Sequence, residues 1–300
     1  MQKKIELMIA GAQKAGTTSL NRYLSQHPKI YTHSTIEFGM FANVPSYEKG
    51  FDYYHKNTVP DEVKDNPEKS IFVAKRVGLM CNQQLLIKLR EHNPDVKVAM
   101  VLRNPIERAF SAFLYCRNSG MEPYTEFNDA IYKNDPKRFK GNEEIKKNCQ
   151  YVYRSSYLQH LQNVYAVFPA ENIKVYLFEE MIANLNVTLN DMISQVGLGN
   201  FDFDVSMKYN ERQVAKSSLL TKLISPGKTS FIKNIIPLQQ RTKLKQVLRG
   251  ANTNKKVKEA DKKAIEPDTR LYLQEIFKKD IKELQEFTQL PLKQYWPEFF

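Results

Sequence analysis

The chain has 300 residues, of which 42% are hydrophobic and 11% are aromatic, enough to bury one large core. This composition excludes a disordered or fibrous protein. The net charge of +12, with a pI near 9.3, indicates that the protein handles something acidic, which is a nucleotide, a polyanion or a membrane surface.

The N-terminal apolar run, Ile5 to Ala10, is the first predicted strand. It is too short for the apolar part of a signal peptide or for a membrane span, and it breaks at Gly11. We therefore expect a cytoplasmic protein. The three cysteines, Cys81, Cys116 and Cys149, have no CxxC spacing and no histidine cluster nearby, so neither a disulfide framework nor a zinc site is predicted.

Short apolar runs alternate with amphipathic segments along the chain. A glycine-containing turn, Gly11 to Gly16, leads from the first strand into a helix that begins near Thr17. Further strands are predicted at residues 71–74, 96–102 and 173–178, and helices at residues 83–91, 105–113, 155–168, 188–196 and 268–287. This alternation predicts an α/β fold in three layers, with a mainly parallel sheet flanked by helices. The sequence has no repeat and no flexible linker, so residues 1–300 are predicted to form a single domain.

The turn after the first strand has the form of an anion site. A loop between a strand and a helix gathers backbone N–H groups at the positive end of the helix dipole. The loop keeps both glycines of a Walker A sequence, Gly11 and Gly16, but Thr17 stands where that sequence has its lysine. The lysine lies inside the loop instead, at Lys14. The pattern predicts a P-loop-like fold. The missing lysine disfavours a kinase that uses ATP, which remains the main alternative function for this chain.

This loop resembles the phosphosulfate loop of the PAPS-dependent sulfotransferases, especially their heparan-sulfate-type and bacterial branch. Their loop reads Lys-x-Gly-Thr-[Ser/Thr]-x-Leu just after the first strand, and residues 14–20 match it closely. The resemblance implies that 3′-phosphoadenosine 5′-phosphosulfate (PAPS) is the co-substrate, that PAP is the product, and that no metal is needed. It also implies a set of nucleotide contacts: Lys14, Ala15, Gly16, Thr17, Thr18 and Ser19.

The second motif of the same family is R-x-P-x-x-R-x-x-S, which grips the 3′-phosphate of the nucleotide. Residues 103–111 reproduce it in full, from Arg103 at the end of a strand to Ser111 on the next helix. An arginine offers a forked, permanently charged donor to phosphate oxygens, and a serine hydroxyl adds one hydrogen bond. The resemblance therefore implies that Arg103 and Ser111 bind the 3′-phosphate.

Two weaker similarities extend the resemblance toward the C-terminus. Tyr157, in a Ser-x-Tyr pair, corresponds to a residue near the nucleotide, although a buried tyrosine is more often part of a core. Lys216 matches a basic position in a late loop that covers PAPS, as a contact to the 3′-phosphate or to the substrate. A solvated lysine is an equally good interpretation of Lys216.

Sulfuryl transfer needs an in-line arrangement, a base for the acceptor proton, and positive charge near the sulfonate and the leaving oxygen. The resemblance implies that Lys14 meets the bridging oxygen and that Glu37, in a partial match to Glu-x-x-Phe-Phe, is the base. His33 is the rival base, because the cytosolic branch of the wider superfamily uses a histidine.

Lys75 lies where relatives have the pattern Glu-Lys-x-Pro, in which the lysine faces both the sulfonate and the acceptor. Ala74 replaces the acid of that pattern and Val77 replaces the proline. The resemblance therefore implies the same role for Lys75. It does not imply that the residues beside Lys75 recognise the acceptor as they do in relatives.

The acceptor is expected to be a small molecule or a glycan, most directly a carbohydrate hydroxyl or amine. Bacterial members of the same branch also sulfate lipids and biosynthetic intermediates, so those acceptors stay open. The lysine-rich stretch runs from Lys222 to Lys263. A basic nucleic-acid-binding protein ranks last, because the lysines near Lys255 lack interleaved aromatic residues. That stretch is either a solvated surface or a loop facing a polyanion.

Overall fold

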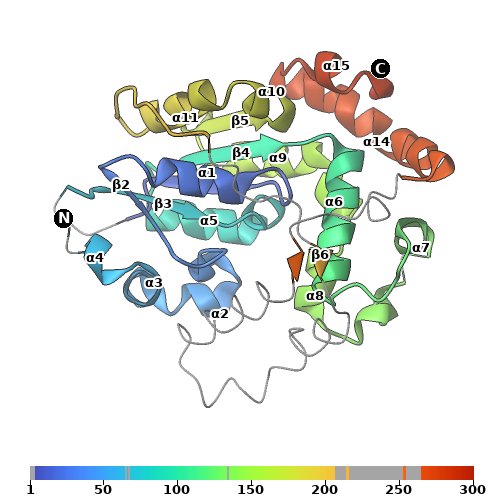
Figure 1. Cartoon of the computed structure of the whole chain (residues 1–300), viewed down its shortest axis with the longest axis horizontal. Coiled ribbons are helices and arrows are strands. Elements are labelled where there is room, and N and C mark those ends of the chain that lie inside the picture. Colours follow the sequence, from blue (N-terminus) through green and yellow to red (C-terminus); the bar gives the residue numbers. More distant parts are fainter. Residues whose placement is uncertain are drawn as a thin grey trace. The chain divides into compact units, whose positions relative to one another are not determined.

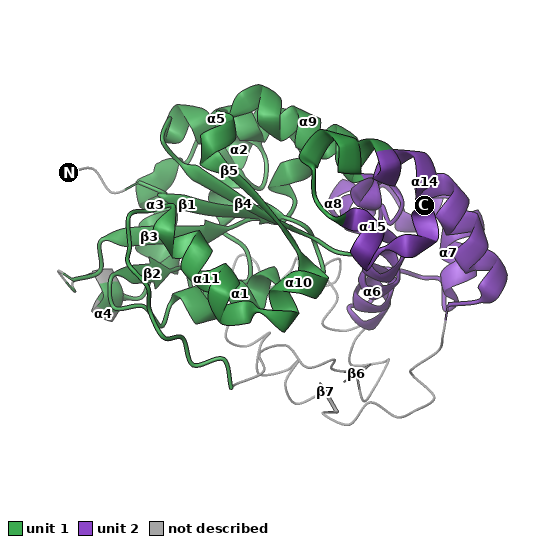
Figure 2. Ribbon diagram, turned by 90° about the horizontal axis from the view of Figure 1, so that it is seen from above, with its two compact units in different colours: residues 1–104, 157–210, 283–291 green, residues 105–156, 211–282, 292–300 purple. Residues whose placement is uncertain are grey.

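The computed structural model describes residues 4–206, apart from residues 65, 67 and 134, and residues 214–215, 253–254 and 265–300. The chain divides into two compact units (Figure 2). The first contains residues 1–104, 157–210 and 283–291, and the second contains residues 105–156, 211–282 and 292–300. The single domain expected from the sequence stays a prediction.

The first unit contains a five-stranded sheet in which all strands are parallel (Figure 1). Its strands are β1 (Leu7–Gly11), β2 (Ile30–Thr32), β3 (Ile71–Lys75), β4 (Lys97–Leu102) and β5 (Ile173–Leu177), in the order β2-β3-β1-β4-β5. All of β1 is buried, and so is β4 after its first residue, as expected for strands covered on both faces.

Helices cover both faces of this sheet (Figure 2). On one face α1 (Thr17–Leu24) packs against α11 (Leu185–Ser194), and on the other α5 (Gln83–His92) packs against α9 (Tyr157–Val167). Further helices of this unit are α2 (Val44–Tyr47), α3 (Gly50–Thr58), α4 (Asp61–Lys64) and α10 (Phe178–Ala183). The three-layer α/β fold predicted from the sequence is confirmed.

The connections that follow β1 and β4 run toward opposite edges of the sheet. The chain leaves β1 toward β2, beyond β3, whereas it leaves β4 toward β5 on the other side. Since β1 and β4 are neighbours, their carboxyl ends mark the position at which open parallel sheets bind their ligands. Both predicted phosphate motifs begin there, because Gly11 ends β1 and Arg103 directly follows β4.

The second unit is mainly helical. It contains α6 (Pro105–Asn118), α7 (Phe127–Tyr132), α8 (Glu143–Asn148), α15 (Leu292–Tyr295) and most of α14 (Pro267–Thr288), and β6 (Val214–Ala215) pairs antiparallel with β7 (Thr253–Asn254). A buried carboxylate, Glu122, lies 3.2 Å from Nε of Arg138 and accepts a hydrogen bond of 2.9 Å from the hydroxyl of Tyr151. In the part of the chain that the structure describes, none of the helices combines the length and apolarity needed to cross a membrane.

The predicted elements differ from the structure mainly at their ends and in short segments. The strand predicted at residues 173–178 ends at Leu177, and Phe178 begins α10. Glu179 and Glu180 lie in the first turn of α10, where their charge complements the helix dipole. The strand β2 was not predicted, because three residues show no periodicity that separates a strand from a loop.

Candidate active site

The loop after β1 forms the N-terminal end of α1. Lys14 and Gly16 both have left-handed backbone, with φ values of 71° and 78°. The N–H groups of Ser19 and Leu20 donate to the carbonyl of Gly16 at 2.9 and 3.2 Å, which begins the helix. Gly16 supplies no side-chain cap, so the positive end of α1 opens onto the loop. This is the geometry of an anion site.

The six loop residues predicted from the sequence differ in exposure. Ala15 and Thr17 are buried. The others are half-buried and present atoms at the surface of the loop: Lys14, Gly16, Thr18 and Ser19. The loop therefore offers both backbone and side-chain donors to an anion.

A side chain at Gly16 is expected to strain the loop and to destabilise the fold. A Cβ there would lie 3.0 Å from Cε of Met181 and 3.1 Å from Cε2 of Phe178, in a left-handed conformation that L residues rarely adopt. We expect Gly16→Ala to lower the free energy of unfolding by about 1 to 3 kcal/mol, measured by chemical denaturation. Gly199→Ala is the control, since a Cβ at Gly199 meets nothing within 4 Å. Equal losses in the two variants would contradict this assignment of strain.

Arg103 lies against the phosphate loop, at the end of the neighbouring strand. Its Nη1 donates to the carbonyl of Lys14 at 3.1 Å, and its guanidinium lies 5.0 Å from the ring centroid of Phe178. The hydroxyl of Tyr157 donates to the carbonyl of Arg103 at 2.7 Å. Tyr157 is fully buried, so in this structure it stabilises the backbone of Arg103 through this hydrogen bond. The structure thus brings Lys14 and Arg103 together.

The other two predicted phosphate contacts lie outside the first unit. Ser111 is half-buried on α6, in the second unit. Lys216 and the lysine-rich stretch from Lys222 to Lys263 lie outside the described residues, apart from the two residues of β7. The pairing of Arg103 with Ser111 and the role of Lys216 stay predictions.

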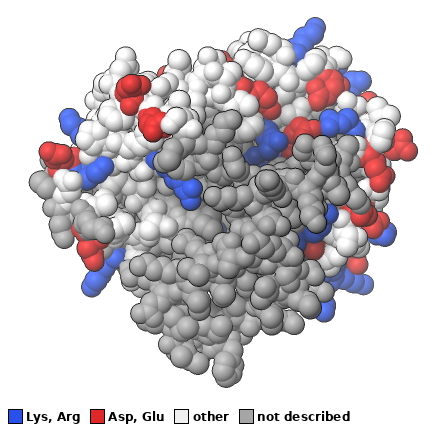
Figure 3. Space-filling model, in the orientation of Figure 1, with Lys and Arg blue, Asp and Glu red and all other residues white. Residues whose placement is uncertain are grey.

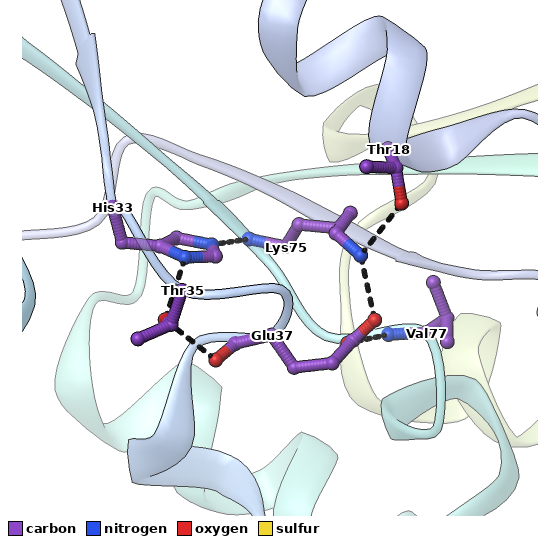
Figure 4. Close-up of polar contacts among 6 residues, drawn as sticks. All are labelled: Thr18, His33, Thr35, Glu37, Lys75 and Val77. Carbon is purple, nitrogen blue, oxygen red and sulfur yellow. Dashed lines mark hydrogen bonds and ion pairs between the residues drawn. The ribbon is translucent and has the colours of Figure 1, made fainter. Parts of the chain in front are cut away.

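Glu37 and Lys75 form an ion pair beside the loop (Figure 4). Nζ of Lys75 lies 2.6 Å from Oε1 of Glu37 and 3.3 Å from the hydroxyl of Thr18, on the first turn of α1. The side chain of Lys75 is 2% exposed and that of Glu37 is 24% exposed. The backbone N–H of Val77 donates to Oε2 of Glu37 at 2.9 Å. The carboxylate is thus within reach of solvent and is connected to the phosphate loop through Lys75 and Thr18.

His33 is buried behind this pair, and both of its ring nitrogens have partners within the protein (Figure 4). Its Nε2 accepts the backbone N–H of Lys75 at 3.1 Å, so the neutral ring carries its proton on Nδ1, 3.0 Å from the hydroxyl of Thr35. That hydroxyl donates to the carbonyl of Glu37 at 2.9 Å. Burial, together with the charge of Lys75, lowers the pKa of His33 to about 3. The arrangement favours Glu37 over His33 as the group that accepts a proton from a ligand.

This arrangement has the parts that group transfer from a charged donor requires. The loop that ends at Gly16 leads into α1, which carries Thr18. Contacts then run from Thr18 to Lys75 and from Lys75 to Glu37. The lysine can neutralise charge on a transferred group, and the carboxylate can accept a proton from an attacking hydroxyl or amine. Among the described residues, His, Cys, Asp and Glu form no cluster of three or more that could hold a metal ion.

Charge is unevenly distributed along the chain. Residues 208–263 contain 15 Lys and Arg against 3 Asp and Glu, whereas the rest of the sequence contains 30 of each, so this segment accounts for the whole net charge of +12. On the face drawn in Figure 3, the described basic side chains are interspersed with acidic ones. The mixed charges on the described part of that face therefore give no support for a nucleic-acid-binding surface there.

Several contacts of this site were not anticipated from the sequence. Thr18 was predicted as a nucleotide contact, but its hydrogen bond with Lys75 was not predicted. The contact between the guanidinium of Arg103 and the ring of Phe178 was not predicted either. The position of Phe178 just beyond β5, next to β4, is a signal that could have indicated the second contact. The backbone donor at Val77 leaves no signal in the sequence, because every residue except proline carries an N–H group.

The sequence and the fold are similar to those of known proteins. Residues 4–285 match the model of the sulfotransferase domain family. A bifunctional heparan sulfate N-deacetylase/N-sulfotransferase 2 from Bos taurus is 24% identical over 217 residues, which cover 69% of this chain and 23% of that protein. The bifunctional heparan sulfate N-deacetylase/N-sulfotransferase from Drosophila melanogaster is 25% identical over 205 residues, which cover 62% of this chain and 19% of that protein.

A solved structure, of a sulfotransferase from Alicyclobacillus acidocaldarius, is similar in fold, with a TM-score of 0.65 and 21% identity. The similarity covers 97% of this chain and 98% of that one. The matched region spans only about a fifth to a quarter of the length of the two curated relatives named above. Because the family model matches nearly the whole sequence, the chain belongs to the sulfotransferase domain family.

Proposed function

We propose that this enzyme transfers a sulfuryl group from PAPS to a hydroxyl or amine of a carbohydrate acceptor. The observation that carries the proposal is the ion pair of Lys75 with Glu37, connected through Thr18 to the anion loop. Membership of the sulfotransferase domain family supports the type of reaction. The match of residues 14–20 and 103–111 to the PAPS motifs supports the donor.

In the proposed reaction the acceptor oxygen or nitrogen attacks the sulfur of PAPS in line with the bridging oxygen. Glu37 accepts the acceptor's proton as the new bond to sulfur forms. The bond from sulfur to the bridging oxygen breaks, and PAP leaves with the electron pair. Lys75 offsets charge on the sulfonate, and Lys14 meets the bridging oxygen as its negative charge grows.

The nucleotide is proposed to bind at the carboxyl ends of β1 and β4. Arg103 follows β4 and donates to the carbonyl of Lys14, so its guanidinium lies beside the loop that is proposed to hold the 5′-phosphosulfate. A guanidinium suits bidentate binding of phosphate, and the 3′-phosphate is the group that PAPS carries and ATP lacks. Arg103 is therefore proposed to select PAPS over ATP, together with Ser111.

The proposal also specifies the class of acceptor, a carbohydrate. It is supported by the names of the curated relatives, which are heparan sulfate N-sulfotransferases, although this chain spans only a fraction of their length. It is also supported by Glu37, because a glutamate base belongs to the branch that the sequence resembles most, and His33 is enclosed by Lys75 and Thr35.

Calorimetry with PAP and with ATP tests the donor. We expect wild-type protein to bind PAP with micromolar or tighter affinity and ATP at least tenfold more weakly, because Arg103 reads the 3′-phosphate. Loss of a charge-assisted hydrogen bond costs about 1.5 to 3 kcal/mol, so Arg103→Ala should weaken PAP binding by about tenfold or more.

Arg22→Ala is the matched control, because Arg22 is an exposed arginine in the last turn of α1, away from the phosphate loop. We expect this variant to bind PAP within twofold of wild type. If Arg103→Ala also bound PAP within twofold, and wild type bound ATP as tightly as PAP, the proposed donor would be wrong.

A further inference from the structure

Each carboxylate oxygen of Glu37 has a partner among the described residues (Figure 4). Oε1 faces Nζ of Lys75 at 2.6 Å, and Oε2 accepts the backbone N–H of Val77 at 2.9 Å. The two donors differ in kind. Lys75 donates through a charged ammonium at the end of four rotatable bonds, whereas Val77 donates through the main chain, which has no side-chain freedom.

Lys75 has a second task that conflicts with holding Glu37. Its Nζ also lies 3.3 Å from the hydroxyl of Thr18, on the helix that begins at the phosphate loop, where the donor is proposed to bind. In the proposed reaction the ammonium is drawn toward the sulfonate, where negative charge accumulates. Oε1 then loses its partner at the moment when the carboxylate must point at the acceptor, and the contact with Val77 remains.

The N–H of Val77 is fixed by hydrogen bonds on both sides. The preceding residue, Arg76, donates its backbone N–H to the carbonyl of Ile9 on β1 at 3.0 Å. The carbonyl of Arg76 accepts the N–H of Leu79 at 3.0 Å, which closes a turn around Val77. A donor held in this way keeps its direction when ligands bind or leave.

The backbone of Glu37 is fixed relative to the same strand end. The N–H of Phe38 donates to the carbonyl of Lys75 at 2.8 Å, and the hydroxyl of Thr35 donates to the carbonyl of Glu37 at 2.9 Å. With its main chain anchored and Oε2 held by Val77, Glu37 has little freedom to rotate its carboxylate.

We infer that the backbone N–H of Val77 is a positioning donor, which holds the Glu37 carboxylate in the orientation that accepts the acceptor's proton. The inference rests on the proposed function. It also makes use of a departure from the pattern Glu-Lys-x-Pro: a proline at position 77 would have no N–H to donate, and this chain has valine there.

The test compares two substitutions that differ in the donor. Val77→Ala shortens the side chain and keeps the N–H, whereas Val77→Pro removes the N–H. Transfer of ³⁵S from PAPS to a glucosamine-containing polysaccharide gives the turnover number, and calorimetry gives the affinity for PAP. We expect Val77→Pro to turn over at least tenfold more slowly than Val77→Ala, with PAP affinities within twofold of each other.

A backbone ester at position 77, made with the hydroxy acid analogue of valine, removes the N–H without the ring of proline. It serves in place of Val77→Pro if that variant fails to fold, and we expect the same loss of turnover. In a Glu37→Gln background the ester should cause no further loss, because no carboxylate base is left to orient.

Equal turnover of the ester and the wild type would overturn the inference and leave the proposed function intact, provided that Glu37→Gln shows the expected loss of about 10² to 10⁴ and keeps a measurable residual rate. An equal loss from the ester in the Glu37→Gln background would also overturn it, since the N–H would then act on the fold alone. Full activity of Glu37→Gln would overturn the proposed base and this inference with it.

Discussion

Replacing Glu37 with glutamine is expected to lower the turnover number at saturating PAPS by about 10² to 10⁴, the usual contribution of general-base catalysis. Glutamine keeps the shape of the side chain, and its oxygen can still accept one of the hydrogen bonds that Lys75 and Val77 donate to the carboxylate. It cannot take up the acceptor's proton. PAP affinity and the melting temperature should therefore change little, and ³⁵S transfer should nearly stop.

Glu91→Gln is the matched control, because Glu91 is an exposed glutamate on α5 whose partner is Lys88 at 2.8 Å. This variant should retain wild-type turnover. The rival base is tested in parallel with His33→Ala. An inactive His33→Ala with a nearly fully active Glu37→Gln would place the enzyme in the histidine-dependent branch and would remove the argument for a carbohydrate acceptor.

Lys75→Ala is expected to lower turnover by about 10² to 10³, the loss typical of removing one preorganised donor to developing charge. The substitution also leaves Oε1 of Glu37 without the ammonium at 2.6 Å, so it weakens the site from two directions. We expect the KM of the acceptor to rise as well, because the lysine is proposed to face both sulfonate and acceptor. Steady-state kinetics with both substrates varied would measure the two effects.

The double variant Lys75→Ala/Glu37→Gln separates these contributions. Since part of the loss from Lys75→Ala acts through Glu37, the two losses should be less than additive, and Lys75→Ala should slow the Glu37→Gln variant by a smaller factor than it slows wild type. Lys88→Ala is the control for loss of a lysine, because the ion pair of Lys88 with Glu91 is on the surface. Losses of Lys75 and Glu37 that simply add would contradict a shared role.

Much of the fold was predictable because strands of a covered parallel sheet are apolar along their whole length. The runs at residues 71–74 and 96–102 could be recognised for that reason and became β3 and β4. The small helices α2, α3 and α4 were not predicted. α2 and α4 have only four residues each, and such short helices depend on tertiary contacts that a sequence pattern does not contain.

The candidate site was predictable in part, and the limit has a physical cause. The loop at Lys14 and the arginine at Arg103 each belong to a local motif, and their contact follows from the adjacency of β1 and β4. Glu37 and Lys75 are 38 positions apart, and their pairing depends on the path of the segment between β2 and β3, which contains α2, α3 and α4. The orientation of the Val77 N–H depends on backbone torsions, which residue identity does not specify.

The most direct test of the proposed function is a double-label assay, in which PAPS labelled with ³⁵S and ATP labelled with ³²P at its γ-phosphate compete in one reaction. The acceptors are a glucosamine-containing polysaccharide, a phenol and a fatty alcohol. We expect wild-type protein to transfer ³⁵S and no ³²P, with the polysaccharide as the best acceptor, and Glu37→Gln to transfer neither label. Transfer of ³²P in place of ³⁵S would contradict the assignment as a PAPS-dependent sulfotransferase.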